Sequence, residues 1–117
     1  KLCIYDKNFD NYNKFVNNKH FECPKMYNKE RYNGSKADIW SLGVCLIMVI
    51  FNIIPYNIPS STDHLFRNII NDLHKWSGKS NRAKYVDKHA LDLLQRIFCV
   101  EEHRIDIKKL NRHTYLK

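Results

Sequence analysis

Two pairs of residues in this chain have the types and the spacing of metal ligands. His20 lies three positions before Cys23, and Cys99 lies four positions before His103, which would place the second pair on one face of a continuous helix. Structural zinc sites take four Cys or His ligands at short, paired spacings. Because neither pair is matched by a second one at zinc-site spacing, the sequence predicts no metal site.

The cysteines suggest reduced thiols. Cys3, Cys23, Cys45 and Cys99 stand singly and form no Cys-x-x-Cys motif. Disulfide frameworks belong to oxidising compartments and use many cysteines in small domains. The pattern therefore favours an intracellular protein, in the cytoplasm.

Length and charge narrow the functional classes further. The 117 residues suffice for one domain or a piece of one. The chain has no signal peptide and no initiating Met, which suits an internal fragment. Twenty Lys and Arg against 12 Asp and Glu give a net charge of +8, but the charges are interleaved with no basic tract of five. We therefore expect no binding to nucleic acid.

The candidate residues must be positioned by helices, and the clearest one covers residues 35 to about 51. Ser35 or Asp38 is predicted to cap it, and Asn52 to close it. Apolar residues cover all of its faces, so we expect it to be buried on every side. A bilayer span needs about 20 apolar residues, and the run from 39 to 54 is shorter, so no membrane segment is expected.

Three further helices are predicted from caps and apolar periodicity. Ser61 or Thr62 would cap a helix with one apolar stripe that continues to residue 76. Asp87 and Asp106 would cap the third and fourth helices.

The remainder of the chain is expected to be loop. Residues 1–34 are rich in Asn, Lys and Tyr and show little periodicity, apart from a short helical turn expected after Pro24. Residues 77–81 are predicted to form another loop. The predicted fold class is therefore all-α, a long loop followed by four helices, with no strand and no internal repeat.

Four stretches, in order, carry a resemblance to a known family. "KADIWSLGVCLIMVIF" (36–51) resembles the central helix of the large lobe of eukaryotic-type protein kinases, whose pattern is Asp-x-Trp-Ser-x-Gly before an apolar run. "CPK" (23–25) stands in the place of that family's Ala-Pro-Glu, and "IPY" (54–56) in the place of its Pro-Phe. "EEHRIDIKKLNRHTYL" (101–116) resembles its ending. The resemblance covers residues 15–117 and is to a divergent Ser/Thr-type kinase.

This resemblance implies a C-terminal kinase lobe, with residues 1–34 as activation and substrate-docking segment and 35–117 as the helical part. The phosphate loop, the catalytic loop and the metal-binding Asp-Phe-Gly would all precede Lys1. Phosphoryl transfer needs nucleotide, metal and acceptor to be positioned together. The fragment alone is therefore expected to bind no cofactor and to be inactive. ATP and Mg are implied for the parent kinase, and its partners would be a protein substrate and the upstream kinase lobe.

The resemblance also implies roles for single residues that support the catalytic loop. Asp38 is similar to the helix aspartate that accepts hydrogen bonds from catalytic-loop amides. Its alternative role is that of a plain N-cap. Trp40 is expected to anchor the core and Gly43 to permit close packing, while Arg104 belongs to the same supporting set.

Substrate docking is implied for a short segment before the Cys-Pro-Lys stretch. The segment consists of Asn17, Asn18, Lys19, His20 and Phe21. Asn17 and Asn18 stand where the family commonly has Gly and Thr. The Thr hydroxyl helps to orient the catalytic residues of Ser/Thr-type members, so this departure leaves the activity of the parent open.

Regulation by phosphorylation would fall on tyrosines. No Ser or Thr precedes Ser35, and Tyr5 and Tyr12 are the candidate phosphorylation sites in the activation segment. The alternative is that these side chains pack or face solvent.

Lys25 is a second departure from the family pattern. It replaces the glutamate of Ala-Pro-Glu, which in the family pairs with an arginine matched here by Arg104. Two cations in one place would repel each other. We hypothesise that Lys25 turns into solvent and that Arg104 pairs with Glu22 or Glu30.

Two main functions follow from these residues. The first is a part of a protein kinase that transfers the γ-phosphoryl group of ATP to Ser or Thr of protein substrates. The alternative is a catalytically dead kinase-like module that binds or scaffolds, which the missing catalytic parts favour. A short membrane-anchored helical protein is a third class that rests only on the apolar run.

Overall fold

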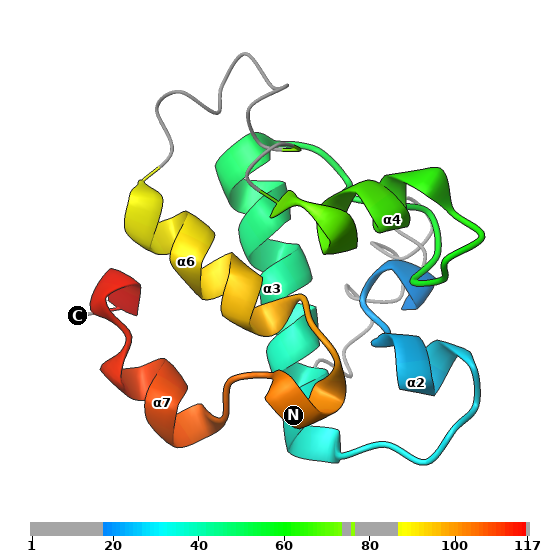
Figure 1. The fold of residues 1–117 in the computed structure, drawn as a ribbon, viewed down its shortest axis with the longest axis horizontal. Helices are drawn as coiled ribbons and strands as arrows, with labels where there is room; N and C mark the ends of the chain where they lie inside the picture. Colours follow the sequence, from blue (N-terminus) through cyan, green and yellow to red (C-terminus); the bar gives the residue numbers. More distant parts are fainter. Residues whose placement is uncertain (1–17, 74–75, 77–86, 117) are drawn as a thin grey trace, which may run out of the picture.

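The longest helix, α3 (Gly34–Phe51), passes through the middle of the molecule, and the other helices are arranged around it (Figure 1). The structure is a computed structural model that describes residues 18–73, 76 and 87–116. Asn33 caps α3 by accepting a hydrogen bond from the Lys36 amide at 3.1 Å. The predicted caps Ser35 and Asp38 are wrong, because the helix begins before them and Asn33 is as good a cap.

The predicted end of α3 is confirmed. Asn52 has the left-handed backbone angles φ 56° and ψ 38°, which Asn tolerates better than most residues. The chain then leaves the helix toward Pro55, which is fully buried. The sequence "FNIIP" therefore stops the helix through backbone geometry.

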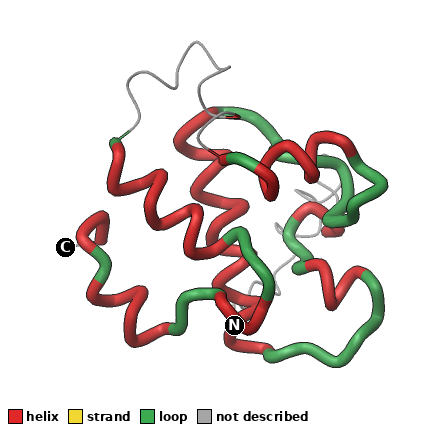
Figure 2. The backbone as a smooth tube through the Cα atoms, viewed as in Figure 1, coloured by secondary structure: helices red, strands yellow, loops and turns green. Residues whose placement is uncertain are grey.

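The other helices are short and are joined by loops (Figure 2). No strand occurs in the part of the chain that the structure describes, in agreement with the predicted all-α class. The α-helices are α2 (Pro24–Tyr27), α4 (His64–Asn71), α6 (Lys88–Ile97) and α7 (Ile107–Arg112). The 3-10 turns are η1 (Asn18–His20), η3 (Glu101–His103) and η4 (Thr114–Leu116).

Aspartate side chains begin three of these helices. Asp87 accepts from the His89 amide at 2.7 Å and Asp106 accepts from the Lys109 amide at 2.8 Å, so both predicted caps are confirmed. Asp63 caps α4, and not Ser61 or Thr62 as predicted. Its carboxylate also accepts the amides of Asn57 and Ile58, which joins the preceding loop to the helix.

Two expectations fall partly or wholly outside the described residues. The predicted helix up to residue 76 is interrupted, since α4 ends at Asn71 and Asp72 has an extended backbone with φ −158°. The short turn predicted after Pro24 is α2 and is confirmed. Of the loop predicted over residues 1–34, residues 1–17 lie outside the described part of the chain, and the described remainder contains η1 as well as α2. The loop predicted over residues 77–81 also lies outside the described part.

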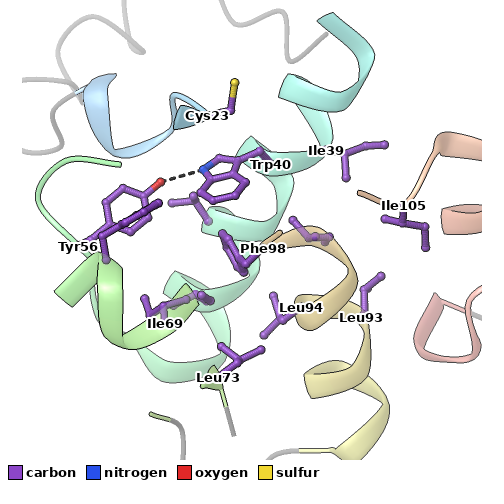
Figure 3. Close-up of a cluster of buried hydrophobic side chains, with 14 of the residues drawn as sticks. Cys23, Ile39, Trp40, Tyr56, Ile69, Leu73, Leu93, Leu94, Phe98 and Ile105 are labelled. Carbon is purple, nitrogen blue, oxygen red and sulfur yellow. Dashed lines mark hydrogen bonds between the residues drawn. The ribbon is translucent and has the colours of Figure 1, made fainter. Parts of the chain in front are cut away.

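Side chains from α3, α4 and α6 meet in one core (Figure 3). The Trp40 ring lies edge-on to Phe98, with ring centroids 4.8 Å apart and planes at 84°. Phe66 of α4 contacts Trp40 at 6.1 Å and Tyr56 at 5.3 Å between centroids. Edge-to-face aromatic pairs add about 1 kcal/mol each beyond the area they bury. The core is thus centred on Trp40.

One face of α3 is not covered by the described residues. Its core side comprises Ala37, Ile39, Trp40, Gly43, Val44, Ile47 and Phe51. On the other side Val49 is 79% exposed, and four more apolar side chains are only half-buried, namely Leu42, Leu46, Met48 and Ile50. The expectation that α3 is buried on every side is therefore wrong for this chain, although the apolar residues that led to it are present.

By length and composition alone, α3 could cross a membrane. Its 18 residues have a mean hydropathy of 1.5, and 39% of that stretch is buried inside the structure. The core helix of a globular protein passes the same test, and here Trp40 and Arg104 tie α3 to the rest of the fold. This composition is weak evidence for a membrane span.

Gly43 lets α6 approach α3, and adding a side chain there should destabilise the fold. A β-carbon at Gly43 would lie 2.6 Å from Cγ2 of Ile97 and 3.1 Å from Cζ of Phe98, both buried. We expect Gly43→Ala to lower the free energy of unfolding by about 1–3 kcal/mol through overpacking. This loss exceeds the gain of up to about 1 kcal/mol in helix propensity.

Gly34 provides the matched control in the same helix. A β-carbon there would have nothing within 4 Å, so Gly34→Ala should be neutral or slightly stabilising. Chemical denaturation of both variants measures the difference. Equal midpoints for the two variants would show that α3 and α6 do not approach at Gly43.

Candidate functional site

The docking segment, defined here as residues 18–21, is attached to the core by two side chains. The Tyr56 hydroxyl donates to the His20 carbonyl oxygen at 2.8 Å, and the Ser41 hydroxyl donates to the Phe21 carbonyl oxygen at 2.7 Å. Trp40 completes the first connection, since its Nε1 donates to the Tyr56 hydroxyl oxygen at 2.9 Å (Figure 3). The backbone of the segment is therefore fixed relative to α3.

Tyr56 can hold this position because it remains protonated. Its side chain is 1% exposed, and burial raises its pKa well above the ordinary value, against a smaller lowering effect of the hydrogen bond from Trp40. A neutral hydroxyl can donate one hydrogen bond and accept another at the same time. Trp40, Tyr56 and the His20 carbonyl thus form a continuous buried hydrogen-bonded chain.

The predicted docking residues do not all face outward. Lys19 is exposed and Phe21 is half-buried, whereas the His20 side chain is only 9% exposed and its Nδ1 has no hydrogen-bond partner. Burial lowers the pKa of His20, and the charge of Asp63 partly offsets this. Asn17 lies outside the described residues. Of the predicted set, Lys19 has the most accessible described side chain.

Arg104 joins α3, α6 and the following turn from inside. Its side chain is 4% exposed. Nε donates to the Ile97 carbonyl at 3.1 Å, Nη1 to the Lys36 carbonyl at 3.1 Å and Nη2 to the Cys99 carbonyl at 3.0 Å. The carbonyl of Ile97 ends α6, where a cation is favoured by the helix dipole. Lys36 in turn donates from Nζ to the Arg104 carbonyl.

The guanidinium of Arg104 also lies over the Trp40 ring, with its central carbon 4.8 Å from the ring centroid. Burial lowers the pKa of Arg104, while nearby cysteines and Glu101 oppose this effect. A guanidinium stays charged in proteins, so the site holds a permanent buried cation. Three carbonyl oxygens and the face of the Trp40 ring stabilise that positive charge.

The hypothesis for Lys25 and Arg104 is therefore wrong in both halves. Arg104 binds carbonyls and pairs with neither Glu22 nor Glu30. Lys25 forms ion pairs with Glu101 at 3.0 Å and Glu102 at 3.1 Å. The physical reason is that η3 places two carboxylates where Lys25 can reach them, so neither cation has to turn into solvent.

Glu101 is bound from two sides. Its Oε1 accepts the Asn33 amide at 2.7 Å and its Oε2 accepts Lys25. The Asn33 amide and then Lys25 lower the pKa of Glu101, and the two carboxylates raise the pKa of Lys25. This contact attaches α2 and the start of α3 to η3. The sequence analysis did not predict this contact, because its partners lie 76 residues apart in the chain.

Comparison with known proteins identifies the family in which this arrangement occurs. Residues 3–116 match the family model described as the protein kinase domain. The chain belongs to the protein kinase domain family. The resemblance inferred from four stretches of sequence is confirmed, and the described helices are those of an all-α C-terminal kinase lobe.

Curated relatives of this kinase-family chain are serine/threonine kinases by name. The chain is 30% identical over 97 residues to a "Probable serine/threonine-protein kinase" of Dictyostelium discoideum, covering 82% of this chain and 11% of that protein. It is 29% identical over 96 residues to a serine/threonine-protein kinase of Arabidopsis thaliana, covering 80% and 27%. A serine/threonine-protein kinase of Oryza sativa subsp. japonica is 28% identical over 93 residues, covering 79% and 26%. The chain spans 11–27% of the length of these relatives.

The residues predicted to support the catalytic loop differ in their surroundings. Trp40 is fully buried, and Gly43 lies in close contact with α6, as expected for both. Asp38 is half-buried in the first turns of α3 and is not its N-cap, so that alternative role is wrong. Its support of a catalytic loop stays a prediction. Tyr5 and Tyr12 lie outside the described residues.

The described residues contain no cluster of side chains suited to a metal ion. Among residues 18–73, 76 and 87–116 no group of three or more His, Cys, Asp or Glu could hold an ion. Cys23, Cys45 and Cys99 are free thiols. The family implies ATP and Mg for a complete kinase.

Reversing the charge of Lys25 should destabilise the lobe. In Lys25→Glu a carboxylate would face Glu101 and Glu102, and like charges repel. We expect a lower denaturation midpoint at neutral pH. The carboxylate contribution is present above the ordinary glutamate pKa of 4.5 and is lost as the pH falls through the lowered value, so acid should reduce the difference from wild type.

Lys25→Gln is the matched control, because it removes the cation without adding an anion. It should therefore lose less stability than Lys25→Glu. Chemical denaturation at neutral and acidic pH measures all three proteins. A midpoint of Lys25→Glu at or above that of wild type would contradict the ion pairs.

Proposed function

We propose that this chain is the C-terminal lobe of a serine/threonine protein kinase whose complete form transfers the γ-phosphoryl group of ATP to protein substrates. The observation that carries the proposal is the kinase family match over residues 3–116, together with relatives named as serine/threonine kinases. The buried connection from α3 to the docking segment supports it, since a substrate must be held in fixed geometry for phosphoryl transfer.

In this proposal the chain positions the protein substrate and does not take part in the chemistry at the nucleotide. Tyr56 and Ser41 hold the backbone of the docking segment, and Lys19 offers an exposed cation beside it. Asp38 would accept amides of the catalytic loop from the upstream part. When bound there, ATP and Mg would supply the transferable phosphoryl group and the charge neutralisation.

The uncovered face of α3 suggests where the upstream lobe packs. Val49 is 79% exposed, Ile53 45% and Ile54 41%; Val49 lies near the end of α3, and the two isoleucines lie just after it. Large apolar side chains exposed in one part of the chain suggest an interface. We assign this surface to the upstream kinase lobe. Three free thiols agree with a reducing location inside the cell, in the cytoplasm.

The test is phosphoryl transfer by the natural protein that contains this chain. The protein is incubated with γ-labelled ATP, Mg and a mixture of protein substrates, and the modified residues are identified by mass spectrometry. We expect label on Ser or Thr, and none when residues 1–117 replace the whole protein. If the protein transfers no phosphoryl group, whether or not it binds nucleotide, the proposed kinase activity is wrong and the binding module is favoured.

The binding module is the second candidate, and one observation favours it. Asn17 and Asn18 replace the Gly and Thr common in the family segment that orients the catalytic residues. Asn18→Thr with Asn17→Gly in the natural protein distinguishes the two. A gain of transfer from a silent protein would identify a degenerate kinase, whereas an active wild type identifies an enzyme that tolerates both residues.

A further inference from the structure

A pocket of about 770 Å³ lies between α6, η3 and α7, and none of its lining residues belongs to the docking segment. We refer to it as the α6–α7 pocket. Five Lys or Arg side chains and three Asp or Glu side chains line it. The groups that decide its character are Arg96, Lys109, Arg112, Asp92, Glu102 and Asp106.

Each carboxylate of the α6–α7 pocket already has a donor. Asp92 accepts from Arg96 at 2.9 Å and contacts His113 Nε2 at 2.7 Å. Asp106 caps α7 by accepting the Lys109 amide at 2.8 Å. Glu102 pairs with a lysine of α2. The negative charges of the pocket are thus largely neutralised or engaged within the protein.

His113 contacts Asp92 from the other side. Its Nδ1 accepts the Tyr115 amide at 3.1 Å, which leaves the ring hydrogen on Nε2, directed at Asp92. The His113 side chain is 8% exposed. Asp92 is therefore held between His113 and Arg96, and these two donors lower its pKa, Arg96 most.

Two cations of the pocket lack such partners. Lys109 and Arg112 are exposed and stand three residues apart on α7, so they share one face. Neither forms an ion pair with a carboxylate within the described ranges, whereas Arg96 does. An anion that enters the pocket would meet two cations that form no ion pair there, although Lys109 also interacts electrostatically with Asp106 at the start of the helix.

We propose that the α6–α7 pocket binds a phosphorylated segment of a partner protein, with the phosphate on Lys109 and Arg112. A phosphate offers several acceptor oxygens to such cations. The volume exceeds that of one ion and suits a few residues of peptide. Because cations and carboxylates are interleaved in the lining, a single phosphate among neutral residues fits the pocket better than the uniform negative charge of a nucleic acid.

The experiment measures binding and is independent of any kinase activity. A fluorescent ten-residue peptide with one phosphoserine among neutral residues is titrated with the natural protein and followed by anisotropy. The matched probes are the same peptide with serine, inorganic phosphate as competitor, and a single-stranded oligonucleotide. We expect the phosphopeptide to bind, and the serine peptide and inorganic phosphate to bind at least about tenfold more weakly.

Two double variants locate the site. Lys109→Gln with Arg112→Gln should weaken phosphopeptide binding about tenfold or more. Lys88→Gln with Lys108→Gln removes the same charge from exposed residues outside the pocket and should change it less than about twofold. Gln has a helix propensity close to that of Lys and Arg, so α7 should keep its structure. Should the pair fail to fold, each single variant carries the same test.

The outcomes are distinct. Loss of binding in the pocket variant alone supports the proposal. Equal loss in both double variants would show only a general effect of net charge and would overturn it. Equal binding of phosphate and phosphopeptide would reduce the site to a simple anion site. Tighter binding of the oligonucleotide, or no binding of any probe, would overturn it as well.

Discussion

Replacing Trp40 with alanine is expected to destabilise the protein by about 3–5 kcal/mol, in the range of large-to-small aromatic substitutions in cores. The Trp40 side chain is fully buried and contacts Phe66 and Phe98. Removing it would open a cavity where α3, α4 and α6 meet. It would also withdraw the ring beneath the Arg104 guanidinium.

The measurement is the shift of the chemical denaturation curve of the natural protein. Val100→Ala is a suitable control, because Val100 is 60% exposed and its truncation should change stability by no more than about 0.5 kcal/mol. If Trp40→Ala loses no more stability than Val100→Ala, Trp40 is not central to the core.

A second pair of variants separates packing from hydrogen bonding. Trp40→Phe keeps an aromatic ring but loses the donor to Tyr56, and Tyr56→Phe loses the donor to the His20 carbonyl. Substitutions within one hydrogen-bonded network do not have additive effects on the free energy of unfolding. The double variant should therefore lose less than the sum of the singles, and strict additivity would show that the chain of hydrogen bonds acts as two separate contacts.

The sequence predicted the helices of this lobe well where a single signal decided the outcome. Asp87 and Asp106 each precede an amphipathic stretch without a competing cap nearby, and both were identified correctly. At α3 and α4 several cap residues follow one another closely, and local propensity could not choose among them. Asp63 was selected by tertiary structure, because it also binds the amides of the preceding loop.

Burial and charge partners were harder to predict for a physical reason. The all-round apolar character of α3 predicts complete burial only if all of its neighbours are present, and Val49 is exposed here. The partner of Lys25 lies 76 residues away, at Glu101, so no local pattern indicates it. The carbonyls bound by Arg104 are backbone atoms, which a sequence pattern does not distinguish.

The same family resemblance that identified the site also led to the error at Arg104. In the family this arginine pairs with a glutamate. Because that glutamate is replaced here by Lys25, another carboxylate was expected to take its place. The structure instead satisfies the guanidinium with three carbonyls and the Trp40 ring, while a reversed ion pair forms at Lys25. A buried Arg needs hydrogen-bond acceptors, and carbonyls at a helix end meet that need without a second charge.

Arg104→Leu should accordingly be among the most destabilising substitutions, lowering the free energy of unfolding by about 2 kcal/mol or more. Hydrogen bonds to charged groups contribute about 1.5–3 kcal/mol each, less the solvation that the buried guanidinium gives up, and each of the three carbonyls would lose its guanidinium donor. Arg104→Lys should recover only part of the loss, because an ammonium cannot reproduce the planar fork that reaches three separate carbonyls. Arg112→Leu removes an equal charge from an exposed residue and should change stability little. Denaturation curves of the three variants decide the matter. If Arg104→Lys equals wild type, charge alone stabilises the site; if Arg104→Leu equals Arg112→Leu, the network of carbonyls contributes nothing to the junction of α3 and α6.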